Sequence, residues 1–134
     1  MIQLPRQVEY ALMVLAVMQD APDDHLFSAR ALAAELRIPF DVTAKAMQGM
    51  NRAGILNATQ GKKGGYRINR NLTSVTFDAL IEAMGYPTAL TSCLHHGVQC
   101  KHEKRCKIRT SIARLDQRVR NLFKDVTVLE LITP

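Results

Sequence analysis

With 134 residues and a net charge of +6, the chain has room for one domain and a short additional element. Hydrophobic residues make up 47% of the chain, enough for a packed core without disulfide bonds. Tryptophan is absent and aromatic residues reach only 5%, which argues against a carbohydrate site or a base-stacking surface. No run approaches the ~20 apolar residues of a membrane span, and residues 1–6 lack a secretory pattern, so we expect a cytoplasmic protein without a membrane partner.

The positive charge is concentrated in two zones of the sequence. Between Lys101 and Lys124, nine Lys and Arg residues stand against two acidic residues, and four basic residues and no acid lie between Lys62 and Arg70. Two basic zones on an otherwise acidic chain indicate a polyanionic partner, with nucleic acid as the first choice. A surface that only improves solubility is the alternative.

The first part of the chain predicts three helices. Gln7–Gln19 carries apolar residues at helical spacing. Ser28 is suited to cap a second helix, and Ile38-Pro39 interrupts that helix because proline disfavours a helical conformation in the preceding residue. A third helix with its own apolar face ends at Gly54. The second and third helices predict a helix-turn-helix, with an ordinary helical hairpin as the alternative.

A β-hairpin is predicted directly after these helices. Ile55–Gln60 and Tyr66–Asn69 have strand-like sequences, and Gly61-Lys62-Lys63-Gly64-Gly65 lies between them. The glycines allow positive φ at the turn, and the lysines lie at its tip. This order predicts a winged helix, in which the third helix enters the major groove and the wing reaches phosphates or the minor groove. A surface hairpin with incidental lysines is the alternative.

Two more helices are predicted in the second half, at Thr76–Met84 and from about Lys107 onward. Apolar residues of the last helix recur in steps of four and three, as in a coiled-coil seam: Ile108, Ile112, Leu115, Val119, Leu122 and Val126. This seam favours a dimer, and packing within its own domain is the alternative. We therefore expect a mainly α fold with a small β-hairpin wing. It would comprise a winged-helix DNA-binding domain (residues 1–86), a cysteine loop (87–106), and a dimerisation helix with a C-terminal tail (107–134).

Three cysteines, Cys93, Cys100 and Cys106, fall within fourteen residues. Their spacing matches neither the Cys-x2–4-Cys pairs of zinc sites nor the Cys-x2-Cys runs of ferredoxins. An open loop of three thiolates could enclose an iron–sulfur cluster, because its irons prefer soft ligands. Three histidines between the first and last cysteine keep zinc open, and a redox thiol switch is a further alternative.

Several short motifs are shared with one group of regulators. They are Glu9-Tyr10-Ala11-Leu12, Leu32-Ala33, Ile38-Pro39, Ala53-Gly54-Ile55-Leu56, and the wing Gly61-Lys62-Lys63-Gly64-Gly65-Tyr66-Arg67 followed by the three cysteines. Over most of its length the chain resembles the IscR/NsrR-type (Rrf-two-type) family of bacterial winged-helix regulators. The resemblance implies a homodimeric regulator of transcription, a repressor in our interpretation, that binds a double-stranded DNA operator. It also implies a 2Fe–2S or 4Fe–4S cluster on Cys93, Cys100 and Cys106 that responds to nitric oxide, iron or redox status.

The chain departs from this family at two places. Some members have a histidine three residues after the last cysteine, where this chain has Arg109, whereas others use a carboxylate of the first helix, which corresponds to Glu9. Glu9 is therefore a candidate fourth ligand, and an ordinary solvent-exposed carboxylate is the alternative. The third helix has Val42-Thr43-Ala44 in place of a Tyr-Leu-Glu stretch common in relatives, so the family's familiar operators are not expected.

The expected DNA contacts come from the helix-turn-helix and the wing. Thr43 and Gln48 could read base edges, and Ala44 could lie against a thymine methyl group. The full set is Arg30, Phe40, Asp41, Thr43, Ala44, Lys45, Gln48, Lys62, Lys63 and Arg67. No enzyme motif is present, such as a nucleophile elbow, P-loop or HExxH, so we expect neither catalysis nor a small-molecule substrate. A winged-helix regulator whose cysteines bind zinc or act as a thiol switch, without a cluster, is the alternative function.

Overall fold

The computed structural model describes residues 2–134, so Met1, the first residue of the predicted DNA-binding domain, lies outside them. The elements are α1 (Arg6–Gln19), α2 (Ala29–Leu36), α3 (Phe40–Arg52), β1 (Leu56–Thr59), β2 (Gly65–Ile68), η1 (Leu72–Ser74), α4 (Phe77–Ala83), η2 (Ser92–Leu94), η3 (Glu103–Arg105), α5 (Arg109–Asp125) and α6 (Val128–Ile132). Helices dominate, and β1 and β2 form one antiparallel hairpin, which confirms the predicted fold class.

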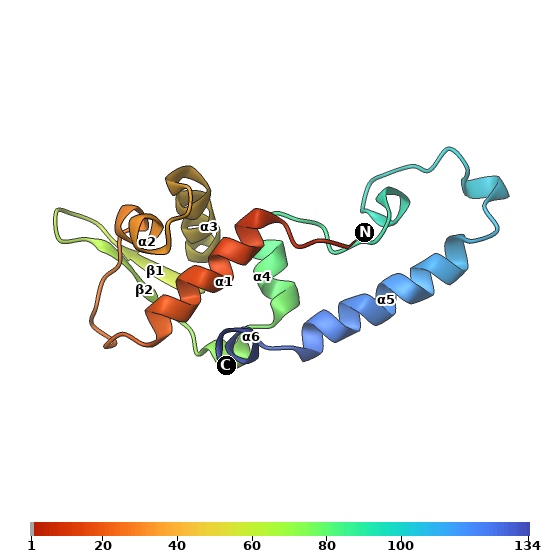
Figure 1. Ribbon diagram of the computed structural model, residues 1–134. Helices are drawn as coiled ribbons and strands as arrows, with labels where there is room; N and C mark the ends of the chain where they lie inside the picture. Colours follow the sequence, from red (N-terminus) through yellow and green to blue (C-terminus); the bar gives the residue numbers. More distant parts are fainter. Residues whose placement is uncertain (1) are drawn as a thin grey trace.

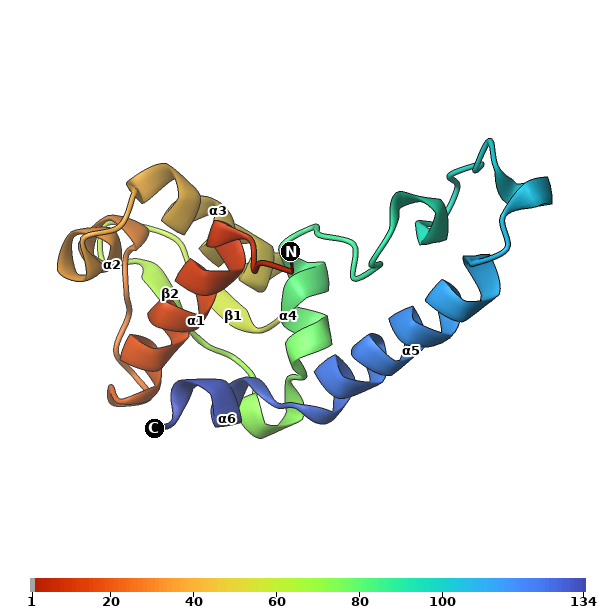
Figure 2. The same ribbon diagram turned by 45° about the vertical axis from the view of Figure 1, so that its right-hand side comes forward.

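The chain forms two regions that are easily distinguished in Figure 1. The first, which we call the module, contains α1–α4, the β1–β2 hairpin and α6. The second, which we call the arm, consists of the cysteine loop (87–106) and α5, and it extends away from the module in both views (Figures 1 and 2). No helix within residues 2–134 is both long and apolar enough to span a lipid bilayer.

The helix-turn-helix is built as its sequence predicts. The side chain of Ser28 accepts a hydrogen bond from the backbone N–H of Ala31 at 3.0 Å, which caps α2. Arg37 ends α2 in the left-handed conformation with φ 55°, and Pro39 then precedes the first turn of α3. The two helices pack against each other, and α3 also packs along α1.

The wing is a short hairpin with Leu56 opposite Ile68 and Thr59 opposite Gly65. The segment before α2 extends it, because Phe27 and Tyr66 exchange backbone hydrogen bonds of 2.8 and 2.7 Å. This approach is close at Gly65, where an added Cβ atom would lie 2.8 Å from the carbonyl oxygen of Phe27. The base of the wing is thus fixed to the helix-turn-helix.

One apolar core fills the module. Its largest fully buried side chains come from most of the module's elements: Val8, Val14, Leu15, Leu32, Met47, Met50, Ile55, Leu56, Val75, Leu80 and Val128. α3 and α4 approach each other closely, since a Cβ atom added to Gly49 would lie only 2.7 Å from the carbonyl oxygen of Ala83. We infer that α3 is held firmly by α1 on one side and by α4 on another.

The C-terminal segment differs from the predicted tail. The chain leaves helical conformation at Val126, and Thr127 and Glu130 then form a capping box that starts α6. Val128 is fully buried, and its N–H donates to the carbonyl of Val75 at 2.8 Å. The last residues therefore complete the core of the module, to which they return after the arm.

Candidate functional site

The outer face of α3 presents a polar stripe to solvent. Asp41, Lys45 and Gln48 are exposed at spacings of four and three residues, so they share one side of the helix. Arg52 is also exposed and continues this spacing by one turn. Arg52 was not among the residues predicted from the sequence, although its position four residues after Gln48 would have indicated it. Ala44 lies beside the stripe and is half-buried.

Thr43 does not belong to this stripe, which corrects its assignment as a reader of base edges. Its side chain is fully buried, and its hydroxyl donates a 2.7 Å hydrogen bond to the carbonyl oxygen of Pro39. Threonine hydroxyls often bond in this way to the carbonyl one turn earlier in a helix. Thr43 therefore packs into the interior of the module and satisfies its hydroxyl within α3.

Arg30 and Phe40 form a pair at the start of α3. The guanidinium carbon of Arg30 lies 4.5 Å from the centre of the Phe40 ring, within range of a cation–π interaction. Phe40 remains 44% exposed, so the pair presents both a ring edge and a cation to solvent. The interaction orders a long basic side chain before any partner binds.

The wing supplies further cations. Lys62, Lys63 and Arg67 are exposed, and none of them has an ion-pair partner within residues 2–134. Unpaired cations on a hairpin are suited to contact DNA phosphates without competition from acids of the same chain.

The three cysteines lie at separate points of the cysteine loop. Cys93 is in η2, Cys106 directly follows η3, and Cys100 lies between these two turns in the sequence. The turns η2 and η3 are separated from each other along the arm in both views (Figures 1 and 2). All three are half-buried free thiols, and the Sγ of Cys93 is 3.2 Å from the hydroxyl of Thr91. Their chemistry fits an iron–sulfur cluster, but within residues 2–134 no three metal-ligating side chains converge on one point.

Glu9 lies on the first turn of α1, where it forms a 3.1 Å ion pair with Arg6. Its side chain is 39% exposed, and it is not grouped with the cysteines in the described part of a single chain. Within one chain, this arrangement corresponds to the surface carboxylate that was considered as the alternative.

The apolar residues of α5 and of its N-cap, Ile108, lie on two faces. Ile108, Leu115 and Leu122 follow one another at seven-residue spacing and are 65%, 49% and 59% exposed. On the other face, the ring of Phe123 packs edge-on against that of Phe77 in α4, with the ring centres 5.1 Å apart. Part of α5 thus packs within its own chain, while an apolar stripe remains uncovered.

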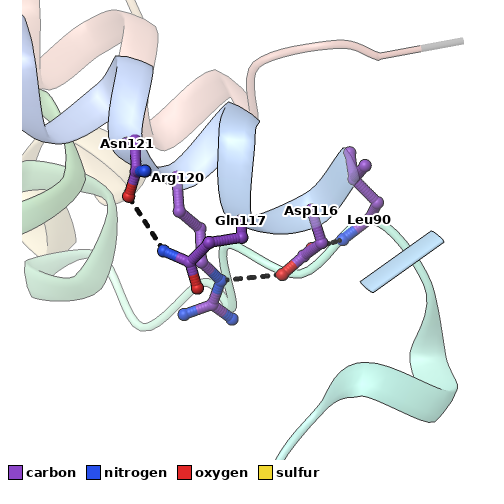
Figure 3. Close-up of polar contacts among 5 residues, drawn as sticks. All are labelled: Leu90, Asp116, Gln117, Arg120 and Asn121. Atoms are coloured by element: carbon purple, nitrogen blue, oxygen red, sulfur yellow. Dashed lines mark hydrogen bonds and ion pairs between the residues drawn. The ribbon is translucent and has the colours of Figure 1, made fainter. Parts of the chain in front are cut away.

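Asp116 is a residue that the sequence analysis missed. It is only 7% exposed, and it is the only buried residue of α5. Its Oδ1 accepts a 2.7 Å hydrogen bond from the backbone N–H of Leu90, and its Oδ2 accepts a 3.0 Å bond from Nε of Arg120 (Figure 3). The available signal was an acid in the middle of a basic helix with an arginine four residues later.

The helix-turn-helix, the cationic wing and the adjoining cysteine loop define a winged-helix DNA-binding protein, and the comparisons agree. Residues 4–134 match the model of the Rrf2 family, described as iron-dependent transcriptional regulators, so the chain belongs to the Rrf2 family of transcriptional regulators. A protein of Aquifex aeolicus described as an HTH-type transcriptional regulator is 25% identical over 127 residues, covering 93% of this chain and 88% of that protein.

Two solved structures share the fold at low identity. CymR of B. subtilis, described as the global cysteine regulator, has a TM-score of 0.71 and 15% identity, with 98% of this chain and 97% of that chain covered. IscR of T. potens has a TM-score of 0.68 and 10% identity, with 98% and 86% covered.

Proposed function

We propose that the protein is a homodimeric repressor whose DNA binding is controlled by an iron–sulfur cluster on the cysteine loop. Cys93, Cys100 and Cys106 would supply three thiolate ligands, and Glu9 is the candidate for the fourth. The observation that carries the proposal is the position of three half-buried free thiols on the connection between α4 of the module and α5. Ligation or modification of these thiols would therefore act where the arm joins the module.

The surroundings of the cysteines suit a cluster. Lys101, Lys104, Arg105 and Lys107 surround the last two cysteines, and all four are exposed, so they can offset the negative charge of a thiolate-ligated cluster. The cysteine loop contains no buried residue of its own within the described chain, so few packing contacts oppose its closure around a ligand. The description of the Rrf2 family as iron-dependent supports the same choice.

The DNA interface in this proposal combines the stripe of α3 with the Arg30–Phe40 pair and the wing. Gln48 is placed to read base edges, whereas Lys45, Lys62 and Lys63 would contact phosphates. Arg67 at the base of the wing and Asp41 at the start of α3 flank these contacts. Two copies joined through the uncovered stripe of α5 would bind two half-sites, as expected of a two-fold protein on DNA.

A second candidate is a regulator of the same DNA-binding type whose cysteines bind zinc or form thiol adducts. The observation that favours its thiol form is that the cysteines do not converge with a third ligand in the described part of a single chain. Cysteines that act singly as redox thiols need no such convergence. The fold shared with CymR is compatible with this candidate as well.

Anaerobic purification distinguishes the two candidates. For the cluster-binding candidate, we expect a coloured protein with visible charge-transfer absorbance and stoichiometric iron and sulfide. We expect the variants Cys93→Ser, Cys100→Ser and Cys106→Ser each to lose this absorbance together with the bound iron and sulfide. Ser92→Ala is the matched control, because this exposed residue adjoins Cys93 and is expected to retain the cluster. Glu9→Gln is expected to retain less iron if Glu9 is a ligand.

The same preparations test control of DNA binding. Fluorescence anisotropy with the protein's own promoter should give different affinities for the iron-loaded and iron-free dimers. A colourless protein with one zinc per chain would select the second candidate. Equal affinity with and without iron and sulfide would reject cluster control altogether.

A further inference from the structure

We propose that Asp116 is the positioning residue through which the state of Cys93 reaches α5 and, from there, α3, the recognition helix of the proposed DNA interface. The inference rests on the proposed function only in that the cysteine loop controls DNA binding, and it applies to a cluster and to a thiol switch alike. It assigns a role to a buried carboxylate that neither DNA contact nor metal ligation uses.

The first observation is how Asp116 is held. Between Gly85 and Thr127, Asp116 is the only buried residue, and its two oxygens are divided between two partners. One oxygen accepts from the N–H of Leu90 in the cysteine loop, and the other accepts from the side chain of Arg120 on its own helix (Figure 3). A carboxylate removed from water is destabilised when it loses a partner, so breaking the Leu90 bond forces α5 or the loop to move.

The second observation is the short connection from Leu90 to Cys93. Thr91 follows Leu90 directly, and its hydroxyl lies 3.2 Å from the Sγ of Cys93. Cys93 itself belongs to η2, whose turn begins only two residues after Leu90. Ligation or modification of the Cys93 sulfur removes the Thr91 contact and moves this turn. This movement displaces the backbone N–H of Leu90, from which Asp116 accepts a hydrogen bond.

The third observation is a continuous path from α5 to the recognition helix. The Phe123 ring of α5 packs on the Phe77 ring of α4, and the carbonyl of Val126 accepts a 2.8 Å hydrogen bond from the N–H of Phe77. At the other end of α4, the carbonyl of Ala83 lies directly against Gly49 of α3. A shift of α5 therefore acts on α3 through packed backbone, with no flexible linker between them.

The arm also provides a matched control. Gln117 and Asn121 form an i,i+4 side-chain hydrogen bond of 2.8 Å on the same helix, one residue along from Asp116 and Arg120 (Figure 3). Both residues are exposed, and their bond does not involve the cysteine loop. Removing it perturbs α5 locally and leaves the Leu90 bond intact.

A double-mutant cycle on the anaerobically purified full chain tests the inference, with affinity for the promoter as the readout. We expect Cys93→Ser to change DNA affinity by about 10-fold in the native background, as is typical of coupling between two sites. In the Asp116→Ala background, Cys93→Ser should change the affinity by less than about 2-fold. In the Gln117→Ala background the full change should remain.

Amide hydrogen exchange at Leu90 gives a second readout that a purely structural role would not produce. In the reduced, iron-free chain the Leu90 N–H should be protected, and ligation or modification of Cys93 should remove this protection. Cys93→Ser should keep the protection under both conditions, Asp116→Ala should lack it under both, and Gln117→Ala should behave as the native chain. Asp116→Asn retains an oxygen for Leu90, so it should keep both the protection and the coupling if Asp116→Ala proves too unstable to study.

The possible failures are distinguishable. If Cys93→Ser leaves DNA affinity unchanged in the native background, control through this cysteine fails and the present inference falls with it. If Cys93→Ser acts equally in the native and Asp116→Ala backgrounds, only the role of Asp116 is overturned. Loss of coupling in Asp116→Asn with Leu90 still protected would also overturn the assignment to this hydrogen bond.

Discussion

In the module, nearly every buried side chain is apolar, and these side chains form one core that extends from α1 to α6. In the arm, the one buried residue is an aspartate, while the larger apolar residues Ile108, Leu115 and Leu122 lie exposed on α5. The module is therefore stabilised by its own packing. The conformation of the arm depends on a few hydrogen bonds and on the surface that covers its apolar stripe. It can therefore change on ligand binding at a low free-energy cost.

The largest expected effect concerns the stripe of the arm. Leu115→Ala combined with Leu122→Ala should weaken the dimer by at least about 100-fold. Each leucine is about half-exposed, so its burial in the dimer contributes about half of the roughly 1.5–3 kcal/mol of a fully buried leucine, and four leucines are lost per dimer. Sedimentation velocity over a range of protein concentrations measures the dissociation constant of the dimer. Leu131→Ala is the control, since Leu131 is 45% exposed on α6, away from the stripe. An unweakened dimer would show that a second copy does not cover this face.

The next effect tests the rigidity of the module. Gly49→Val should lower the free energy of unfolding by about 1–3 kcal/mol, because the added carbon atoms meet the backbone carbonyl of Ala83. Urea denaturation gives the value, and DNA affinity should fall as α3 moves away from α4. Ala53→Val, at an exposed position just after α3, serves as the control. Unchanged stability would mean that the contact between α3 and α4 is looser than the structure describes.

A third experiment asks which region contacts DNA. Lys62→Ala with Lys63→Ala should reduce the slope of log affinity against log salt by up to about two units, since two fewer counterions are released. The comparison pair is Lys101→Ala with Lys104→Ala in the basic zone of the arm, which should leave the slope unchanged. If the wing substitutions leave the salt slope unchanged, the wing does not contact DNA. If the arm substitutions reduce the slope, the DNA interface extends beyond the module.

The smallest effect concerns the junction at which the arm returns to the module. The backbone N–H and the hydroxyl of Thr127 donate to the carboxylate of Glu130 and lower its pKa. Because the folded chain favours the ionised form, this contribution is present at neutral pH and is lost as the pH falls through the pKa of Glu130.

Glu130→Gln should therefore reduce Tm slightly at neutral pH and by less at acidic pH. Thermal unfolding followed by circular dichroism across this pH range checks the prediction. Glu35→Gln on α2 is the control, as this exposed carboxylate has no hydrogen-bond partner within residues 2–134. An equal loss of Tm at both pH values would argue against an ionic contribution from the capping box.

Local signals made the module predictable. The cap at Ser28 and the wing between Ile55 and Asn69 depend on residues close together in the sequence, and the structure contains both. Thr43 lies four and seven residues before Met47 and Met50, on the apolar face of α3, but a threonine on such a face can be buried or exposed, and it was wrongly assigned as a DNA contact. That choice depends on the core that α3 joins, where Thr43 is fully buried.

By itself, the sequence determined the mainly helical fold, the wing and the grouping of three cysteines, because caps, glycine turns and apolar periodicity act over a few residues. Three features were decided only by the tertiary structure. The C-terminal residues pack back onto the module as α6, Asp116 accepts a hydrogen bond from the N–H of Leu90, and one apolar face of α5 stays uncovered. These features join residues far apart in the chain. Their burial and pairing depend on how whole elements pack, and no local pattern encodes that.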